Sequence, residues 1–342
     1  MTSRLFIPEV DIVRQAPAYV PGHQLLAGKS VLITAAAGAG IGYAAARRSA
    51  EEGCRALMIS DIHPRRLEEA VERLKAETGL QAIYGQLCNV TVEEEVQALV
   101  AAAEQALGGV DVLINNAGLG GQKRVAEMSD EEWTRVLDIT LTGTFRMTRA
   151  MLPHMQQRGG GAIVNNASVL GWRAQKEQAH YAAAKAGVMA LTRCSALEAA
   201  EFGVRINAVS PSIALHDFLK KASSEQLLEQ LASREAFGRA AEVWEVANVM
   251  MFLPATTPPT WWAKCFQSVR NTPEEPVMTS VFANAEQLRE AVGKPLGATD
   301  WLLIEQERVN QFAEAPAITS GSMSIRSAPP AARSAVASPT VT

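Results

Sequence analysis

The sequence predicts an α/β fold in which one parallel sheet is covered by helices on both faces. Three observations predict it: short, fully apolar segments alternate with longer helical segments, this alternation runs from about residue 26 to residue 253, and a glycine-rich turn joins the first apolar segment to the first helix. Because crossovers between parallel strands are right-handed, such a chain winds outward from the centre of its sheet in both directions. We therefore expect a doubly wound parallel sheet.

The individual elements follow from their apolar patterns and end signals. Strands are expected at residues 30–34, 56–60, 82–86, 110–115, 162–166 and 205–209. Helices are expected at residues 41–53, 64–78, 92–107, 131–157 and 181–202. The first helix ends at Gly53, because glycine readily adopts the left-handed conformation of a helix end. This order of elements is typical of a Rossmann fold.

Composition places the chain among ordinary globular proteins, with 48% apolar and 20% charged residues. A net charge of −4 gives no basic field for nucleic acid, and no apolar run reaches the roughly 18–20 residues of a membrane helix. The four cysteines lack zinc-ligand spacing, which predicts reduced thiols and no metal site. The first residues lack the layout of a signal peptide, so we expect a cytoplasmic protein without nucleic-acid or membrane partners.

The segment from Thr34 to Gly42 (TAAAGAGIG) predicts a dinucleotide site. Gly38, Gly40 and Gly42 let the backbone approach a pyrophosphate, and the helix that begins at Ile41 attracts its charge. A glycine-rich stretch alone is weak support, and an ordinary strand–helix turn is the alternative. Its place between an apolar strand and a helix favours the dinucleotide interpretation.

Two further positions extend this site. Asp61 ends the second strand about 20 residues beyond the glycines, where a carboxylate can accept hydrogen bonds from the adenosine ribose and repel a 2′-phosphate. This favours NAD over NADP. Arg65 and Arg66 follow closely and are either phosphate ligands, which would favour NADP, or solvated residues at a helix start. Asn116-Ala117-Gly118 follows the fourth strand, where short polar residues and glycine suit a tight turn along the cofactor edge.

Tyr181 and Lys185 predict proton transfer, since they lie one turn apart on a single helix face. A free tyrosine has a pKa near 10, and a nearby cation is expected to lower the pKa of the phenol. Ser168 ends the preceding strand, and its hydroxyl can bind a substrate carbonyl. Beside a hydride donor, these groups predict reduction of a ketone or oxidation of an alcohol.

These residues, in this order, resemble the short-chain dehydrogenase/reductase family over residues 26–253. The resemblance implies that Ser168 orients the substrate, Tyr181 is the acid/base, and Lys185 binds the nicotinamide ribose and tunes Tyr181. Further cofactor contacts that it implies are made by Thr34, Asn89, Val90, Asn116, Pro211 and Ile213.

The chain departs from the family pattern at four positions. Ala35 stands where the glycine turn begins Thr-Gly, and Thr140 stands where the family has an asparagine that holds a proton-relay water. Asn89 replaces an aspartate near the adenine, and Ser212 replaces a glycine after a proline. A threonine can bind a water, so Thr140 is retained as a catalytic candidate.

The segments TAAAGAGIG, NNASVLGWRAQ and SPSIA resemble one branch of the family, which acts on hydroindanone coenzyme A esters in bacterial sterol-ring breakdown. This implies an NAD(P)-dependent enzyme of steroid catabolism. Trp172, Arg173 and Gln175 follow Ser168, where a bulky polar substrate could pass, although loop packing also explains Trp172. The alternatives are a 3-oxoacyl-thioester reductase, a catalytically impaired NAD-binding relic and a non-enzymatic binding module.

The family pattern stops after residue 254. The codons for ATTPPTWWAKC can also be read in a shifted frame, in which each new codon begins on the third base of a written codon. This frame permits Asp-Tyr-Ser-Ser-Tyr-Leu-Val-Gly-Glu-Val, which resembles the missing end of the family sheet. We interpret residues 255–277 as an aberrant linker caused by a frameshift or sequencing error, with a genuine divergent extension as the alternative. The last strand is then missing or altered, although Trp261 and Trp262 could partly cover the exposed edge.

The remaining segments complete the predicted organisation. Residues 278–314, which begin at Met278, resemble the start of a MaoC-like hot-dog hydratase without its catalytic pair, so no hydratase activity is expected. Residues 315–342 predict a disordered tail, and residues 1–25 predict a surface arm. Because the family often assembles through its last strand and two long helices, we expect a homo-oligomer, either a dimer or a weakened tetramer.

Overall fold

The computed structural model describes residues 16–216, 219, 224–235, 237–255 and 265–267. Its centre is a parallel sheet of seven strands. In sheet order the strands are β3 (Ile83–Leu87), β2 (Ala56–Asp61), β1 (Ser30–Ile33), β4 (Val112–Asn115), β5 (Gly161–Asn166), β6 (Val204–Ser210) and β9 (Cys265–Gln267). This order confirms the doubly wound Rossmann sheet.

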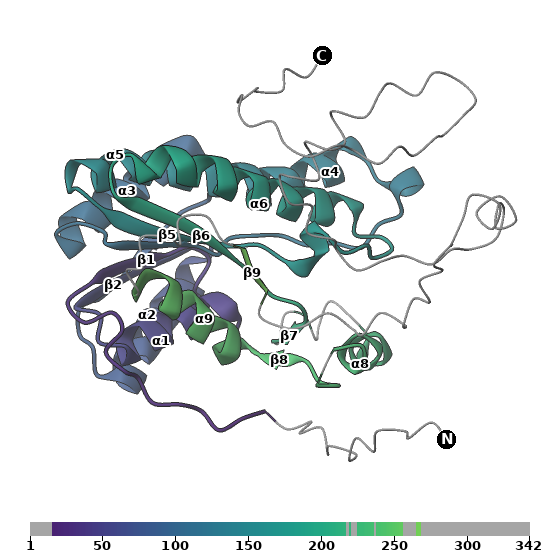
Figure 1. Cartoon of the computed structure of the whole chain (residues 1–342), viewed down its shortest axis with the longest axis horizontal. Helices are drawn as coiled ribbons and strands as arrows, with labels where there is room; N and C mark the ends of the chain where they lie inside the picture. The colour runs from purple at the N-terminus through teal and green to yellow at the C-terminus, as the bar shows by residue number, and fades with distance from the viewer. Residues whose placement is uncertain (1–15, 217–218, 220–223, 236, 256–264, 268–342) are drawn as a thin grey trace, which may run out of the picture. The chain divides into compact units, whose positions relative to one another are not determined.

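Helices cover both faces of this sheet (Figure 1). One face carries α1 (Ile41–Glu51), α2 (Pro64–Thr78) and α9 (Val243–Ala255). The other carries α3 (Glu93–Leu107), α5 (Gly143–Gln157) and α6 (Ala179–Ala200). The predicted helix at 131–157 is divided into α4 (Asp130–Leu137), a π-helical turn (Asp138–Thr142) and α5. Among the described residues, no helix is long and apolar enough to cross a membrane.

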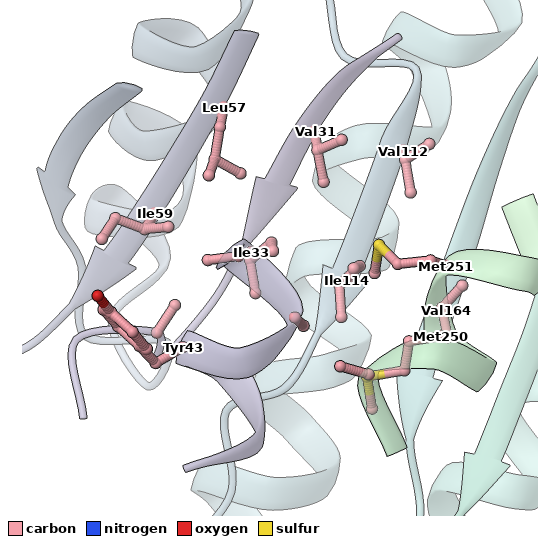
Figure 2. Packing of buried hydrophobic residues seen from close by; sticks show 14 of the residues in the cluster. Val31, Ile33, Tyr43, Leu57, Ile59, Val112, Ile114, Val164, Met250 and Met251 are labelled. Atoms are coloured by element: carbon pink, nitrogen blue, oxygen red, sulfur yellow. The ribbon is translucent and has the colours of Figure 1, made fainter. Parts of the chain in front are cut away.

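Strand side chains alternate between the two helix layers, which explains why the strands are apolar along their whole length. Val31 and Ile33 of β1 pack in the layer of α1 and α9, whereas Leu32 packs in the layer of α3 and α5. Figure 2 shows Val31 and Ile33 on the side of the sheet where Met250 and Met251 of α9 lie. All five side chains are buried, and burying each stabilises the fold by about 1.5–3 kcal/mol.

The sheet reverses its winding between β1 and β4, which are adjacent in space but far apart in sequence. The carboxyl ends of these strands are followed by the Thr34–Gly42 turn and by Asn116. Ligands of doubly wound sheets bind in the crevice at this reversal point. The fold therefore places the two predicted cofactor segments side by side.

The far edge of the sheet decides between the two outcomes predicted for the last strand, missing or altered. A strand is present in the last position, but it is short: Cys265–Gln267 pairs in parallel with Ala208–Ser210 of β6. The last strand is thus altered rather than missing. Trp261 and Trp262, the hydratase-like segment 278–314 and the tail 315–342 lie outside the described residues.

Residues 16–25 run across α1 as the predicted arm, while residues 1–15 lie outside the described part. The ring of Tyr19 meets that of Trp244 edge-on, with 5.2 Å between centroids. The fully buried Glu52 carboxylate accepts hydrogen bonds from the backbone N–H groups of His23 (2.7 Å) and Leu25 (3.1 Å) and pairs with Arg48 at 2.5 Å. Hydrogen bonds to the buried carboxylate of an ion pair therefore attach the arm to the fold.

Candidate active site

The glycine turn is held against the end of β4 by a dense set of hydrogen bonds. The Thr34 hydroxyl accepts from the backbone N–H groups of Asn116 and Ala117, both at 3.0 Å. The Asn116 side-chain amide donates to the carbonyls of Thr34 (3.1 Å) and Ala35 (3.0 Å). Ala35 is driven into the left-handed region, with φ of 52°. The turn is therefore held in this shape by contacts within the chain.

The glycines of this turn have different functions. A Cβ added to Gly42 would lie 2.5 Å from both the Ala35 carbonyl oxygen and Asn116 Nδ2, so no other residue fits there. A Cβ on Gly38 would meet no heavy atom within 4 Å, so the space above it is open. In the described structure α1 begins without a side-chain cap or an acidic residue in its first turn. Free N–H groups at a helix start beside open space fit a pyrophosphate.

Asp61 is the last residue of β2, and its carboxylate accepts hydrogen bonds from the backbone N–H groups of Ala37 (3.3 Å) and His63 (3.1 Å). Burial raises the pKa of Asp61, opposed by the Ala37 hydrogen bond and the Arg66 charge. Arg66 lies 3.9 Å from this carboxylate, and the highly exposed Arg65 lies 3.6 Å from Glu69. Both arginines thus have carboxylate neighbours, and the Asp61 carboxylate is hydrogen-bonded to the glycine turn at Ala37.

The two residues predicted near the adenine follow β3. The side-chain oxygen Oδ1 of Asn89 accepts from the Thr91 backbone N–H (3.1 Å) and from the Thr91 hydroxyl (2.8 Å), which closes a tight turn. Val90 is buried in the α3 and α5 layer. Asn89 also lines an open surface hollow together with the exposed Ile62, where a flat ring could lie.

The structure brings Ser168, Tyr181 and Lys185 together. Ser168 lies just beyond β5, where its hydroxyl accepts from the Leu170 N–H at 3.2 Å and is hydrogen-bonded to Tyr181. Lys185 lies one turn after Tyr181 on α6, and its ammonium nitrogen is 5.6 Å from the centroid of the Tyr181 ring. Gly118 and Gly120 border the pair, because Cβ atoms added there would lie 3.4 Å from Lys185 Nζ and 3.7 Å from Tyr181 Cδ2.

The pKa of the phenol differs from the expectation that Lys185 lowers it. Burial raises the pKa of Tyr181 to about 12, and the hydrogen bond with Ser168 only partly opposes this. Burial also lowers the pKa of Lys185 to about 8. The physical reason is that both groups lose water, while the ammonium donates its hydrogen bond to the Asn166 carbonyl. At neutral pH the phenol therefore carries its proton and can act as an acid.

Thr140 lies in the π-helical turn and is fully buried. Its hydroxyl accepts from the Leu119 N–H (3.0 Å) and donates to the Leu119 carbonyl (3.2 Å). Its own carbonyl accepts from the Thr144 hydroxyl at 2.8 Å. These bonds fix the loop beside Tyr181, and they use the single hydrogen of the hydroxyl while leaving it one lone pair to accept from a water.

The segment after β6 closes another side of the site. The Pro211 carbonyl accepts from the Val169 N–H at 3.0 Å, and the Ile213 carbonyl accepts from the Ala241 N–H at 2.9 Å. Pro211 is thereby tied to the turn that follows Ser168. Ile213 is tied to the two-stranded sheet of β7 (Ala214–Leu215) and β8 (Ala241–Glu242).

Sequence reasoning missed Asn166, the last residue of β5. Its carbonyl accepts from Lys185, and its side-chain amide donates to Asn116 Oδ1 at 3.0 Å. It therefore joins the predicted proton-transfer residues to the predicted cofactor turn. The available signal was a polar residue at the end of an otherwise apolar strand, two positions before Ser168.

Comparisons with known proteins agree with this geometry. A sequence profile described as short chain dehydrogenase matches residues 29–227. The chain is 60% identical over 239 residues to a Mycobacterium tuberculosis (strain ATCC 25618 / H37Rv) protein named (5R,7aS)-5-hydroxy-7a-methyl-1-oxo-2,3,5,6,7,7a-hexahydro-1H-indene-carboxyl-CoA reductase, covering 70% of this chain and 90% of that protein. It is 35% identical over 225 residues to the 3-oxoacyl-[acyl-carrier-protein] reductase FabG of Staphylococcus aureus (strain Mu50 / ATCC 700699), covering 66% of this chain and 90% of FabG.

Solved structures show the same fold. The crystal structure of a short chain dehydrogenase from Mycobacterium smegmatis is 52% identical, with a TM-score of 0.66 over 75% of this chain and 97% of that chain. Levodione reductase is 31% identical, with a TM-score of 0.67 over 71% of this chain and 96% of that chain. The chain therefore belongs to the short-chain dehydrogenase family of NAD(P)-dependent oxidoreductases.

Proposed function

We propose that the chain interconverts a ring ketone and a secondary alcohol on a coenzyme A ester, with NAD as its cofactor. Hydride exchange at the carbonyl carbon is the chemistry that a bound nicotinamide supplies. The chain's residues handle the oxygen and the proton. Ser168 hydrogen-bonds the ketone oxygen, Tyr181 donates its phenolic proton to that oxygen, and Lys185 holds a positive charge beside the phenol.

One observation carries this proposal: a phenol that is protonated at neutral pH is hydrogen-bonded to Ser168 and lies one helical turn from a buried ammonium. Reduction requires a proton donor at this position, and the phenol of Tyr181, with a pKa of about 12, carries its proton at neutral pH. After the transfer, the Lys185 charge stabilises the phenolate that remains. The reverse sequence describes oxidation of the alcohol.

The proposed cofactor contacts come from the geometry of the turns. Thr34, Gly38, Gly40, Ile41 and Gly42 would surround the pyrophosphate, and Asn116, Ala117 and Gly118 would follow the cofactor edge. Asn89 and Val90 would border the adenine, and Pro211 and Ile213 the nicotinamide. NAD is proposed over NADP because the Asp61 carboxylate, which accepts a hydrogen bond from the glycine turn at Ala37, would repel a 2′-phosphate on an adenosine ribose bound beside it.

The proposed substrate is a hydroindanone coenzyme A ester of bacterial steroid-ring degradation. The 60% identical relative, whose name specifies such an ester, supports it. The loop after Ser168 also presents the side chain of Trp172, which is 49% exposed, as an apolar surface for a fused ring system. The 35% identity to FabG favours a second candidate, a 3-oxoacyl thioester.

The decisive experiment follows NADH absorbance with a hydroindanone-ketone coenzyme A ester and with a 3-oxoacyl thioester, in wild type and Tyr181→Phe. We expect faster turnover of the ring ketone and loss of turnover in the variant. Energy transfer from tryptophan to NADH reports binding separately. Binding without turnover of either ketone would reject the enzyme in favour of the impaired relic or binding module.

We also propose a homo-oligomer formed through α5 and α6. Phe145 of α5 is 40% exposed and Leu197 of α6 is 68% exposed, which supports an apolar contact between copies. Light scattering coupled to size exclusion would show a monomer if this is wrong. A cytoplasmic location is part of the same proposal and is supported by the free thiols of Cys54, Cys88 and Cys194.

A further inference from the structure

We propose that Glu235 is a positioning residue that fixes two segments of the candidate site, called its walls here: the segment after β6, through Ser212, and the segment after Ser168, through Arg173. This inference rests on the proposed function, because it assigns those walls to the ketone and to the nicotinamide. Neither the sequence pattern nor the family resemblance singles out Glu235.

The contacts of Glu235 converge on one carboxylate oxygen. Glu235 follows α8 (Glu225–Ser233) and is only 6% exposed. Its Oε1 accepts a hydrogen bond from the Ser212 hydroxyl at 2.5 Å and lies 3.6 Å from Arg173 Nη1. The Arg173 side chain keeps 26% of its surface exposed. In the described part of the chain, Oε2 is buried without a hydrogen-bond partner.

The two residues that Glu235 holds belong to the segments that form the site. Ser212 lies between Pro211 and Ile213, the proposed neighbours of the nicotinamide. Arg173 lies five positions after Ser168, and its backbone N–H donates to the Val169 carbonyl at 2.8 Å. A shift of Glu235 would therefore be transmitted to the cofactor wall through Ser212 and to the ketone wall through Arg173.

Energetics also favour a positioning role. A buried carboxylate is unfavourable unless charged or hydrogen-bonding partners compensate it, and apolar side chains of similar size often stabilise a fold at least as well. Here the compensation is incomplete, because one oxygen is unpaired in the described structure. The chain instead gains a guanidinium held at Arg173, one position after the exposed Trp172. A cation and an apolar ring on one loop suit a ring substrate that carries an oxygen acceptor, such as a thioester carbonyl.

The test separates the two contacts with four variants of the full chain. Ser212→Ala removes only the hydrogen bond, Glu235→Gln keeps an oxygen acceptor for Ser212 but removes the charge, and Glu235→Ala removes both. Glu229→Gln, at an exposed glutamate of α8, is the matched control. The Kd of NADH is measured by tryptophan-to-NADH energy transfer, and KM and kcat are measured with the ring-ketone coenzyme A ester.

We expect Ser212→Ala to raise the NADH Kd about tenfold with little change in ketone KM, and Glu235→Gln to raise the ketone KM about tenfold with little change in NADH Kd. Glu235→Ala should raise both, and kcat/KM should fall by about 100-fold, as expected for a small misplacement of bound groups. If Glu235→Ala does not fold, the inference is still decided by Ser212→Ala, which should change only the NADH Kd, and by Glu235→Gln, which should change only the ketone KM.

A merely structural role predicts lower melting temperatures without this division between NADH Kd and ketone KM, and that result would overturn the inference. So would equal effects of Glu235→Gln and Glu229→Gln. If wild type binds NADH but turns over neither ketone, the proposed function fails. The NADH Kd of Ser212→Ala then decides the inference: an unchanged Kd overturns it, and a tenfold rise supports its cofactor half.

Discussion

Ala35 is the position where one methyl group should measurably oppose folding. It follows Thr34 in the cofactor turn, and its φ of 52° lies in the left-handed region that L-residues with a side chain avoid. The hydrogen bond from Asn116 to its carbonyl helps to hold it there. Replacing Ala35 with glycine removes the Cβ while leaving every one of these backbone contacts in place.

The magnitude follows from two opposing terms. The left-handed conformation costs an L-residue about 1–2 kcal/mol. Glycine adds freedom to the unfolded chain, which opposes folding by about 0.4–1 kcal/mol. The side chain of Ala35 is exposed, so little packing is lost. We expect Ala35→Gly to raise the free energy of unfolding by about 0.5–1 kcal/mol, or the melting temperature by about 1–4 °C.

Urea unfolding followed by circular dichroism would measure this change, with Ala37→Gly as the control. Ala37 lies in the same turn without a positive φ, so glycine there should lower the free energy of unfolding by about 0.4–1 kcal/mol. Opposite signs for the two variants support the backbone argument. Destabilisation by Ala35→Gly, equal to that of Ala37→Gly, would show that the turn is not strained.

Three other predictions concern the site. Tyr181→Phe should lower kcat about 10²–10⁴-fold with an unchanged NADH Kd, and retention of most of the wild-type rate would reject Tyr181 as the acid. Gly42→Ala should destabilise the chain by about 1–3 kcal/mol in urea and weaken NADH binding, because its Cβ would overlap the Ala35 carbonyl; wild-type stability and affinity would contradict that packing. The folded chain holds Lys185 with a pKa of about 8 against an ordinary 10.5, so between these values it binds fewer protons than the unfolded chain. The free energy of unfolding should therefore rise with pH across that window relative to Lys185→Met, and parallel curves would indicate a solvated ammonium.

Local patterns were sufficient to predict the sheet and the places of most candidate site residues in it. The strands are apolar on both faces because helices cover both sides, and that requirement is visible in the sequence. The predicted turn at Thr34, the residue Asp61 and the Tyr181–Lys185 pair all depend on spacing within one or two elements. For this reason the structure places them where the pattern indicated.

Features that depend on contacts between distant segments could not be predicted. Asn166 reaches Asn116 across 50 residues, and Glu235 reaches Arg173 across 62 positions of the chain. In sequence, Glu235 resembles any solvated glutamate after a helix. The raised pKa of Tyr181 could not be predicted from the sequence either. The spacing indicates the nearby charge of Lys185, but the loss of water around the phenol has the larger effect on its pKa.

The buried Glu52 makes the stability of the enzyme domain depend on a segment that precedes its first strand. Protease cleavage just before Leu26 would remove His23 and Leu25, the two main-chain donors that the carboxylate uses. Each donor lost from such a buried charge destabilises by about 1–3 kcal/mol. Preparations nicked in this region should therefore denature earlier on heating, even though every residue of the cofactor cleft is still present.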